Sequence, residues 1–306
     1  MEVCLAVDVG GTKLAAGLVN TEGEVFAERR VPTPRTADGD ELFEVLAALL
    51  GEVTRHASDA RARVVPPGAT VAICGVGCGG PMDVAAGTVS PLNIPAWRDF
   101  PLRARVAELT GLPVVVDNDA KAFALGEGWT GAARRRRDFI AMVVSTGVGG
   151  GVVVDGRLLG GRSGNAGHVG HVIVEPDGRR CPCGATGCLE AEASGTAIAA
   201  MTGRSPSEAP PEVVRRVGRL VGQAVASVVS LLDVHLAVVG GSVALGFGPP
   251  FFAAANAELA ARARLSFSVG AQVVPSALGP VGPLVGAGAL AWRAAGRAVR
   301  DLDDGT

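Results

Sequence analysis

The stretch STGVGGGVVVDG, residues 145–156, lies between two valine-rich runs and contains more glycine than a tight hairpin turn needs. The stretch DVGGTK, residues 8–13, separates two apolar runs, at 3–9 and 14–20, in a similar way. Each turn combines glycine with threonine, follows a run that is typical of a strand and leads into a second such run. The two stretches therefore form a weak internal repeat of one β-hairpin unit.

The surplus of glycine in both turns indicates that a ligand approaches the backbone closely. Because glycine lacks a Cβ atom, backbone N–H groups can converge on an anion. Two opposed turns of this kind would hold the anionic groups of a triphosphate, and Asp8 would hold Mg²⁺ through water. An ordinary hairpin turn is the alternative for residues 8–13. Neither turn has the spacing of a P-loop or of a dinucleotide-binding motif, which disfavours both of those classes.

Length and composition narrow the class of protein. A chain of 306 residues with 48% apolar content suits two lobes with a large core. Its net charge of −2 gives no electrostatic footprint for nucleic acid or for an anionic membrane as a partner. Without a visible signal peptide or a convincing membrane span, we expect a cytoplasmic protein. The run Arg134–Arg137 is interpreted as a solvated loop, with a contact for a polyphosphate donor as the alternative.

The rest of the chain alternates between helical and strand patterns. Apolar residues at helical spacing predict helices over 40–57, 100–111, 119–129, 210–233, 249–264 and 283–299. Apolar runs bounded by turn residues predict further strands within 70–77, 112–119, 138–147, 150–159, 235–243 and 271–278. Residues 79–97 and 160–195 are expected to form loops. This order predicts a mixed α/β fold in which helices cover sheets.

Residues 116–119, Val-Asp-Asn-Asp, stand where a predicted strand meets a predicted helix. A carboxylate at such a junction can cap the helix. It can also serve as a general base, because the ligands of α/β proteins gather at the carboxyl ends of strands. The helix dipole favours the ionised carboxylate, which is the form that a base requires. The residues alone leave both roles open.

One histidine and three cysteines have the spacing of a closed zinc site. His171, Cys181, Cys183 and Cys188 form the pattern H-x₉-C-x-C-x₄-C, which supplies four ligands for tetrahedral Zn²⁺. In a cytoplasmic chain a metal site is favoured over a disulfide framework. With no position left for water, the zinc would be structural, and it would hold the nearby Glu190 rigidly. The other three cysteines, at positions 4, 74 and 78, are interpreted as small core residues.

Taken as a set, these motifs resemble the ROK family of sugar kinases and sugar-responsive repressors, nearly end to end. The resemblance rests on DVGGTK, GVGCGGPMD with VSPLNIPAW, VDNDAKAFALGE, STGVGGG, GNAGHVGH with CPCGATGCLE, and VVGGSV. It implies a duplicated two-lobe α/β fold of the actin and hexokinase type (ribonuclease H-like), with a central cleft. We expect a smaller lobe from residues 1–119 plus 284–306. Residues 120–283 would form the larger lobe and carry the zinc loop.

The resemblance also implies roles for individual residues. Asp119 matches the catalytic base, which takes a proton from a sugar hydroxyl, usually O6, so that this oxygen attacks the γ-phosphate of ATP. The positions that match the nucleotide side are Asp8, Gly10, Gly11, Thr12, Lys13, Thr146, Gly147, Gly240 and Gly241. The positions that match sugar contacts are Gly80, Asn93, Asn118, Asp119, His168, His171 and Glu190. His171 and the three cysteines match the zinc ligands. The implied cofactors are ATP with Mg²⁺ and structural Zn²⁺, and a homodimer or homotetramer is expected.

One position departs from the family's pattern. The usual sugar signature is Glu-x-Gly-His, whereas this chain has His168-Val169-Gly170-His171. A carboxylate that accepts two hydrogen bonds is thus replaced by an imidazole that accepts one and donates one. Either glucose is bound with altered geometry, or the substrate differs near the ring carbons that this residue meets. We expect His168 to tune the choice of sugar and not the chemistry of turnover.

The motifs leave four functions to compare, of which two are favoured and two are disfavoured. The chain is expected to be an ATP-dependent hexose kinase that phosphorylates the 6-hydroxyl of glucose or a close analogue. The alternative is an amino-sugar 6-kinase of secondary metabolism, acting on kanosamine, glucosamine, N-acetylglucosamine or N-acetylmannosamine. A non-catalytic sugar sensor is disfavoured, because both phosphate turns and Asp119 are intact. A polyphosphate-dependent kinase is disfavoured because that branch of the family lacks the zinc cysteines.

Overall fold

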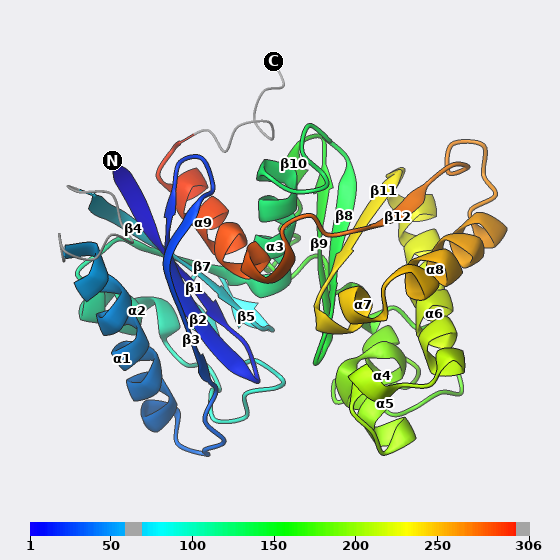
Figure 1. Ribbon diagram of the computed structural model, residues 1–306, viewed down its shortest axis with the longest axis horizontal. Coiled ribbons are helices and arrows are strands. Elements are labelled where there is room, and N and C mark those ends of the chain that lie inside the picture. The colour runs from blue at the N-terminus through cyan, green and yellow to red at the C-terminus, as the bar shows by residue number, and fades with distance from the viewer. Residues whose placement is uncertain (59–68, 298–306) are drawn as a thin grey trace.

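The first of two sheets is built from the amino-terminal part of the chain. In the computed structural model, which describes residues 1–58 and 69–297, this sheet has the strand order β3-β2-β1-β4-β7 (Figure 1). Its strands are β1 (Glu2–Val9), β2 (Lys13–Asn20), β3 (Val25–Pro32), β4 (Thr70–Cys78) and β7 (Val114–Asn118). β2 pairs antiparallel with β1 and β3, whereas β4 pairs parallel with β1 and β7. The β1–β2 hairpin closes at the pair Val9–Leu14, so residues 10–13 form its turn.

The second sheet repeats this topology. Its order is β10-β9-β8-β11-β12, with the same alternation of antiparallel and parallel pairs. Its strands are β8 (Phe139–Val144), β9 (Val148–Val154), β10 (Arg157–Leu158), β11 (Leu236–Gly240) and β12 (Gln272–Pro275). The β8–β9 hairpin closes at Val144–Val148, so residues 145–147 form the second turn. The repeated hairpin and the duplicated two-lobe α/β fold that the sequence predicted are confirmed.

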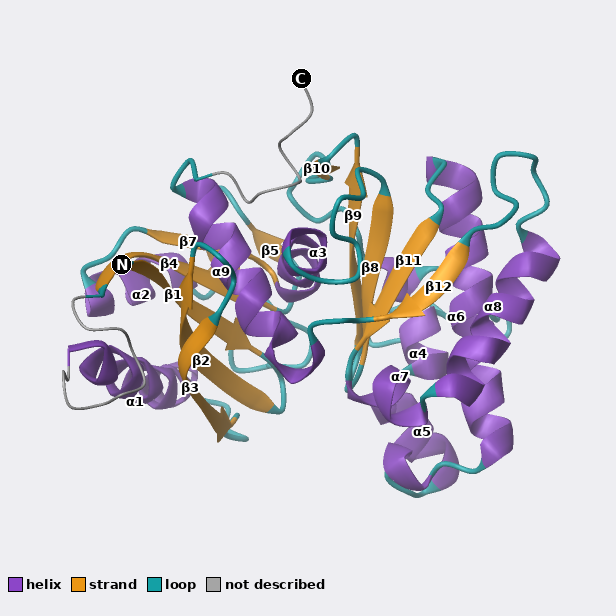
Figure 2. Cartoon of the chain, turned by 45° about the horizontal axis from the view of Figure 1, so that its top comes forward, coloured by secondary structure: helices purple, strands orange, loops and turns teal. Residues whose placement is uncertain are grey.

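Helices form layers outside and between the two sheets (Figures 1 and 2). The outer face of the first sheet is covered by α1 (Gly39–Ser58) and α2 (Leu102–Thr110). The far side of the second sheet carries α4 (Leu189–Ala193), α5 (Gly195–Thr202), α6 (Pro211–Leu232), α7 (Ser242–Phe247) and α8 (Pro249–Arg262). Between the sheets lie α3 (Asp119–Trp129) and α9 (Gly282–Ala294), which pack on each other. The order of layers is therefore helix, sheet, helix, sheet, helix.

The middle layer explains why α3 and α9 are buried on nearly every side. α9 packs on β1 and β4 of the first sheet, and α3 packs on β8 and β9 of the second. A helix in this position is covered by a sheet on one side and by the other helix on another. Trp129 and Trp292 are buried in the cluster that joins the two sheets. The proposed lobe boundary near residue 119 stays a prediction, and residues 298–306 of the first proposed lobe lie outside the described residues.

The segments expected to be loops contain short elements. The loop 79–97 holds β5 (Met82–Asp83) and β6 (Thr88–Val89), which pair with each other. Three short helices, α4, α5 and α7, were not predicted, because five to eight residues are too few to establish a 3.6-residue period. The remaining elements are 3₁₀ turns at Val169–His171, Pro206–Glu208 and Gly279–Val281. Among the described residues, the helices are too short or too polar to cross a membrane.

Candidate active site

Three carboxylates from different elements converge between the two glycine-rich turns. Asp8 is buried near the end of β1, Asp119 begins α3, and Glu190 lies in the first turn of α4. Burial, followed by the nearby charge of Asp119, raises the pKa of Asp8 to about 7. Burial also raises the pKa of Asp119, and the charge of Glu190 raises it further. Because carboxylates this close repel one another, the cluster favours a bound cation or retained protons.

Asp119 does not cap α3, because the neighbouring residue Asn118 provides the cap. The Asn118 side-chain oxygen accepts hydrogen bonds from the N–H groups of Ala120 (3.0 Å) and Lys121 (3.3 Å), so Asn118 is the N-cap of α3. The Asp119 carboxylate accepts a bond from the Ala120 N–H at 2.8 Å, which opposes the rise in its pKa. The capping role considered for the carboxylate thus belongs to the amide. Asp119 remains partly exposed and available to a substrate.

The second glycine-rich turn is held by Glu190. One carboxylate oxygen of Glu190 accepts a hydrogen bond from the Val148 N–H at 2.8 Å. A Cβ atom on Gly147 would lie 2.6 Å from the same oxygen, so only glycine allows this approach. The other carboxylate oxygen remains for a further partner. Glu190 therefore fixes the turn and still presents an acceptor beside Asp119.

The first glycine-rich turn is braced from within its own lobe. The Gly10 N–H donates to the Lys13 carbonyl at 3.0 Å, and the Thr33 hydroxyl donates to the Gly10 carbonyl at 2.6 Å. Asn93 packs against the turn, since a Cβ on Gly11 would lie 3.0 Å from the Asn93 side chain. The predicted sugar contact Asn93 therefore adjoins the predicted phosphate turn. Thr12 and Lys13 are both exposed at its tip.

His168, Asn118 and Gly80 form one wall of the site. A Cβ on Gly80 would lie 3.2 Å from the His168 ring and 3.3 Å from the Asn118 side-chain nitrogen. Because the Asn118 oxygen caps α3, its nitrogen is the group that remains for a ligand. Burial lowers the pKa of His168, and the charges of His171 and Lys121 lower it further. The lowered pKa favours the neutral imidazole of His168, which has one donor and one acceptor.

The predicted nucleotide positions of the second lobe are joined by residues that the sequence analysis did not name as site residues. The hydroxyls of Ser145 and Ser242 lie 2.9 Å apart, which joins the second turn to the segment that follows Gly240 and Gly241. The Thr196 hydroxyl donates to the Thr146 carbonyl at 2.9 Å. Ser145 and Ser242 each adjoin a motif that was recognised, so their position was a usable signal. Thr196 is 50 residues from its partner, and no local pattern indicates it.

The four predicted zinc ligands lie together. Their ligand atoms are all within 4.8 Å of one another. Cys181 Sγ is 3.7 Å from His171 Nδ1, and Cys183 Sγ is 3.8 Å from Cys188 Sγ, which is far too long for a disulfide. Tetrahedral Zn–S bonds of about 2.3 Å place two sulfur atoms roughly 3.8 Å apart. The donor set and its spacing therefore fit zinc, with the Nδ1 atom of His171 directed at the thiols.

The zinc loop is tied to α6 through a buried carboxylate. Glu192 is 1% exposed and accepts hydrogen bonds from Arg179 and Arg216, at 3.0 and 2.7 Å. These partners lower the pKa of Glu192 and outweigh the opposite effect of burial. The Gln223 amide donates to the Val174 carbonyl at 2.9 Å. Both ends of the loop that carries His171 and Glu190 are therefore fixed to the lobe.

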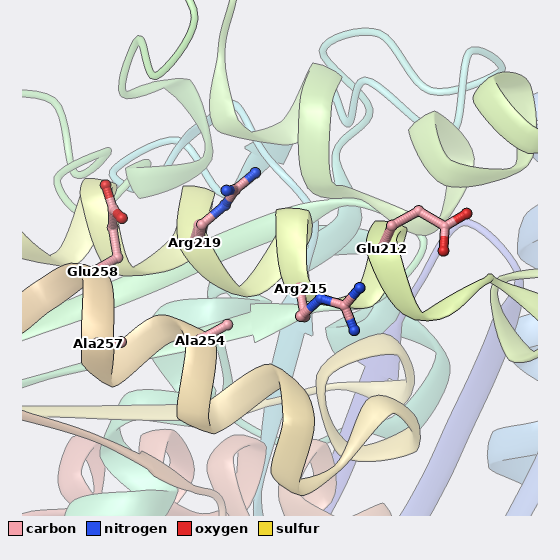
Figure 3. A pocket seen from close by; sticks show the side chains of 6 residues that line it. All are labelled: Glu212, Arg215, Arg219, Ala254, Ala257 and Glu258. Atoms are coloured by element: carbon pink, nitrogen blue, oxygen red, sulfur yellow. The ribbon is translucent and has the colours of Figure 1, made fainter.

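Two other features lie away from this cluster. The run Arg134–Arg137 is exposed before β8, at the opposite end of that strand from the second turn. A hollow of about 370 Å³ lies between α6 and α8 (Figure 3). Its lining consists of Glu212, Arg215, Arg219, Ala254, Ala257 and Glu258. Since none of these matches a predicted site residue, the hollow is separate from the candidate active site.

The chain is similar along most of its length to proteins of one family. The model of the ROK family matches residues 4–294. The N-acetylmannosamine kinase of Escherichia fergusonii is 37% identical over 260 residues, which span 80% of this chain and 84% of that protein. The ROK family glucokinase from Streptomyces griseus, solved with glucose and AMPPNP, gives a TM-score of 0.82 at 31% identity, covering 95% and 99% of the two chains. The ROK hexokinase from Thermus thermophilus gives 0.78 at 33%, covering 96% and 99%. The chain therefore belongs to the ROK family of sugar kinases, as its motifs predicted.

Proposed function

We propose that this protein transfers the γ-phosphate of ATP to the 6-hydroxyl of a hexose, with Asp119 as the general base. The observation that carries the proposal is the place of Asp119 in a cluster with Asp8 and Glu190, between the two glycine-rich turns. Asp119 takes the hydroxyl proton, the sugar oxygen attacks the γ-phosphorus, and the bond to the bridging oxygen breaks, which releases ADP. A base in this role must lie about 3 Å from the attacking hydroxyl.

The other groups orient the substrates and neutralise charge. The phosphates lie against the backbone N–H groups of residues 11–12 and 146–147, since the Gly10 N–H is taken by the Lys13 carbonyl. Bound Mg²⁺ would neutralise charge on the phosphates, and Asp8 is the carboxylate placed to hold it through water. Glu190 accepts from a sugar hydroxyl with its unoccupied oxygen, and Asn93 and Asn118 contact the sugar. Phosphoryl transfer depends mainly on such positioning and electrostatic stabilisation.

We infer further that an N-acylamino hexose, N-acetylmannosamine first among them, is the preferred acceptor. Two observations support this choice. The relative from Escherichia fergusonii carries that name at 37% identity, and His168 here replaces the carboxylate of the usual signature. A neutral His168 can donate to a carbonyl oxygen of the acyl group, whereas a carboxylate would repel it. Glucose is the second candidate, because the fold matches a glucokinase at a TM-score of 0.82.

A panel of sugars tests both statements. Release of ADP is followed with glucose, glucosamine, kanosamine, N-acetylglucosamine and N-acetylmannosamine as acceptors. We expect the highest kcat/KM with N-acetylmannosamine, and His168→Glu should shift the preference toward glucose. If no sugar releases ADP, the kinase proposal is wrong. If His168→Glu leaves the order of the panel unchanged, the role of His168 in sugar choice is wrong.

A further inference from the structure

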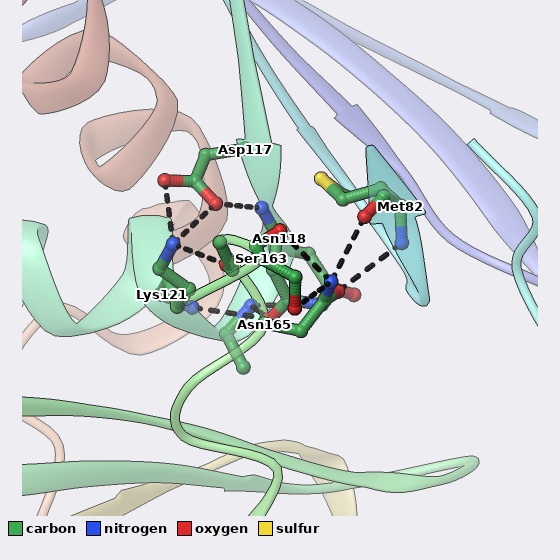
Figure 4. A network of polar contacts seen from close by, with 9 residues as sticks. Met82, Asp117, Asn118, Lys121, Ser163 and Asn165 are labelled. Carbon is green, nitrogen blue, oxygen red and sulfur yellow. Dashed lines mark hydrogen bonds and ion pairs between the residues drawn. The ribbon is translucent and has the colours of Figure 1, made fainter. Parts of the chain in front are cut away.

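The loop that follows β10 of the second sheet is joined to β5, a short strand that pairs with β6 in a two-stranded sheet. Asn165 lies in the loop after β10, and its side-chain oxygen accepts a hydrogen bond from the Met82 N–H at 3.2 Å. Its side-chain nitrogen donates to the Met82 carbonyl at 2.9 Å (Figure 4). Met82 is in β5, which follows β4 of the first sheet. One amide thus satisfies both backbone groups of a residue 83 positions away, as a neighbouring strand would.

The side chain of a buried lysine forms a further hydrogen bond to the same segment. Lys121, on α3, is 3% exposed, and its ammonium group donates to both oxygens of Asp117, at 2.7 and 2.8 Å. It also donates to the Gly164 carbonyl at 2.9 Å, as Figure 4 shows. Gly164 has a φ of +85°, and a Cβ there would lie 2.6 Å from the Val84 side chain. The segment therefore contacts both Met82 and Val84.

This fastening lies next to the wall that faces the sugar. His168 follows Asn165 by three residues, and Gly80 precedes Met82 by two. His168 and Gly80 are themselves in close approach, as a Cβ on Gly80 would lie 3.2 Å from the His168 ring. The hydrogen bonds between Asn165 and Met82 thus fix the distance between the two segments that carry His168 and Gly80. Asn165 contacts neither Asp119 nor the glycine-rich turns through any hydrogen bond found in the described part of the chain.

We propose that Asn165 is a positioning residue for sugar binding, which acts by holding His168 against Gly80 and Asn118. The inference rests on the proposed function, because it concerns the same sugar site. Asn165 sets the width of the wall that meets the hexose ring, and it does so from outside the set of sugar contacts. Its loss widens the wall and weakens binding of the sugar in the ground state, while the nucleotide turns and Asp119 keep their geometry.

The chain contains a matched control for this role. Asn256, on α8, also pairs both ways with one backbone residue, since it accepts from the Val273 N–H and donates to the Val273 carbonyl, each at 2.8 Å. That pairing joins α8 to β12, which carry none of the predicted site residues. Asn165→Ala and Asn256→Ala therefore remove the same two kinds of hydrogen bond. A purely structural role predicts the same consequence for both.

The test compares steady-state constants of the two variants with the acceptor that the wild-type protein uses best. For Asn165→Ala we expect the KM for sugar to rise roughly tenfold, with kcat and the KM for ATP within about twofold of wild type. For Asn256→Ala we expect all three constants to stay within about twofold of wild type. Equal constants for the two variants would overturn the proposal. If Asn165→Ala does not fold, Asn165→Asp keeps the shape and the acceptor but loses the donor, and a raised sugar KM is again expected.

A second arm asks whether Asn165 acts through His168. In a His168→Ala background, Asn165→Ala should add much less to the sugar KM than it does alone, because the residue that it positions is gone. Additive effects of the two substitutions would contradict the mechanism. A wild-type protein without turnover on any sugar would refute the proposed function itself. Normal wild-type turnover with an unaltered Asn165→Ala variant would refute only this inference.

Discussion

The two glycine-rich turns occupy the same place in two copies of one fold, yet the residues next to them differ. In the first lobe the hairpin closes at Val9–Leu14, and the pair before it is Asp8–Ala15. In the second lobe it closes at Val144–Val148, and the pair before it is Val143–Gly149. The register thus places a valine in the second lobe where the first has a buried carboxylate. The backbone frame is duplicated, whereas the acid is not.

The same asymmetry holds at the edge strands β7 and β12 of the two sheets. In the first lobe β7 leads into α3, which begins with Asp119, but residues 276–283 after β12 contain no acidic residue. The second lobe instead contributes Glu190, from the short α4 that follows the zinc ligand Cys188. The comparison teaches that pairing of strands supplies two glycine-rich turns of the same kind, while single residues decide which lobe carries the proposed base.

The largest expected effect follows from removing Asp119, the proposed base, in the first lobe. Asp119→Asn should lower kcat by roughly 10³-fold, because general-base catalysis contributes about 10²–10⁴-fold. The KM values should change little, since the amide keeps the shape of the side chain. Glu108→Gln, which alters an exposed carboxylate on α2, is the control and should behave as wild type. A kcat for Asp119→Asn within tenfold of wild type would show that the base is misassigned.

Asp8, the buried carboxylate that has no counterpart in the second lobe, should also make the stability of the protein depend on pH. Because the pKa of Asp8 is about 7 in the folded protein against 3.8 ordinarily, the native state holds a proton that the unfolded state has lost between these values. Stability therefore falls as pH rises through this window, by about 2–3 kcal/mol between pH 5 and pH 8. Urea unfolding should show that Asp8→Asn abolishes this loss. Identical pH dependence in the two proteins would contradict the account.

Loss of zinc should weaken the second lobe's contribution to sugar binding. Cys183→Ser removes an exposed ligand at little packing cost, so the loop that holds His171 and Glu190 should loosen. We expect less than one zinc per chain by elemental analysis and a sugar KM raised roughly tenfold, the lower end of the effect of disturbing a metal site's support. Cys74→Ser changes a buried thiol outside the cluster and should keep its zinc. Wild-type protein without zinc would defeat this prediction.

The smallest effect is expected at the second lobe's counterpart of Asp8. Val143→Ala removes two methyl groups from a partly buried side chain, which should cost about 1 kcal/mol of stability. The kcat should stay within about twofold of wild type, because no charge is lost beside the phosphates. A large fall in kcat would mean that the two turns are chemically equivalent, against the comparison drawn above.

The features that could be predicted from the sequence are those that depend on contiguous, chemically distinctive motifs. The glycine-rich turns, the spacing of the zinc ligands and the apolar faces of the long helices were all recognisable, and so was the duplication. The sequence could not predict pairings between distant segments, such as Asn165 with Met82, because these depend on how the whole chain folds in three dimensions. It also left open whether a carboxylate at residues 117–119 caps α3 or serves as a base, and in the structure the amide of Asn118 provides the cap. Short helices such as α4 were not predicted, because they span little more than one turn.

The most direct test of the central claim is a crystal structure with N-acetylmannosamine and a non-hydrolysable ATP analogue bound together. The account predicts the sugar's 6-hydroxyl within about 3 Å of the Asp119 carboxylate, the triphosphate against residues 11–12 and 146–147, and His168 beside the acyl group. A sugar bound elsewhere, or an Asp119 side chain directed away from both ligands, would contradict it.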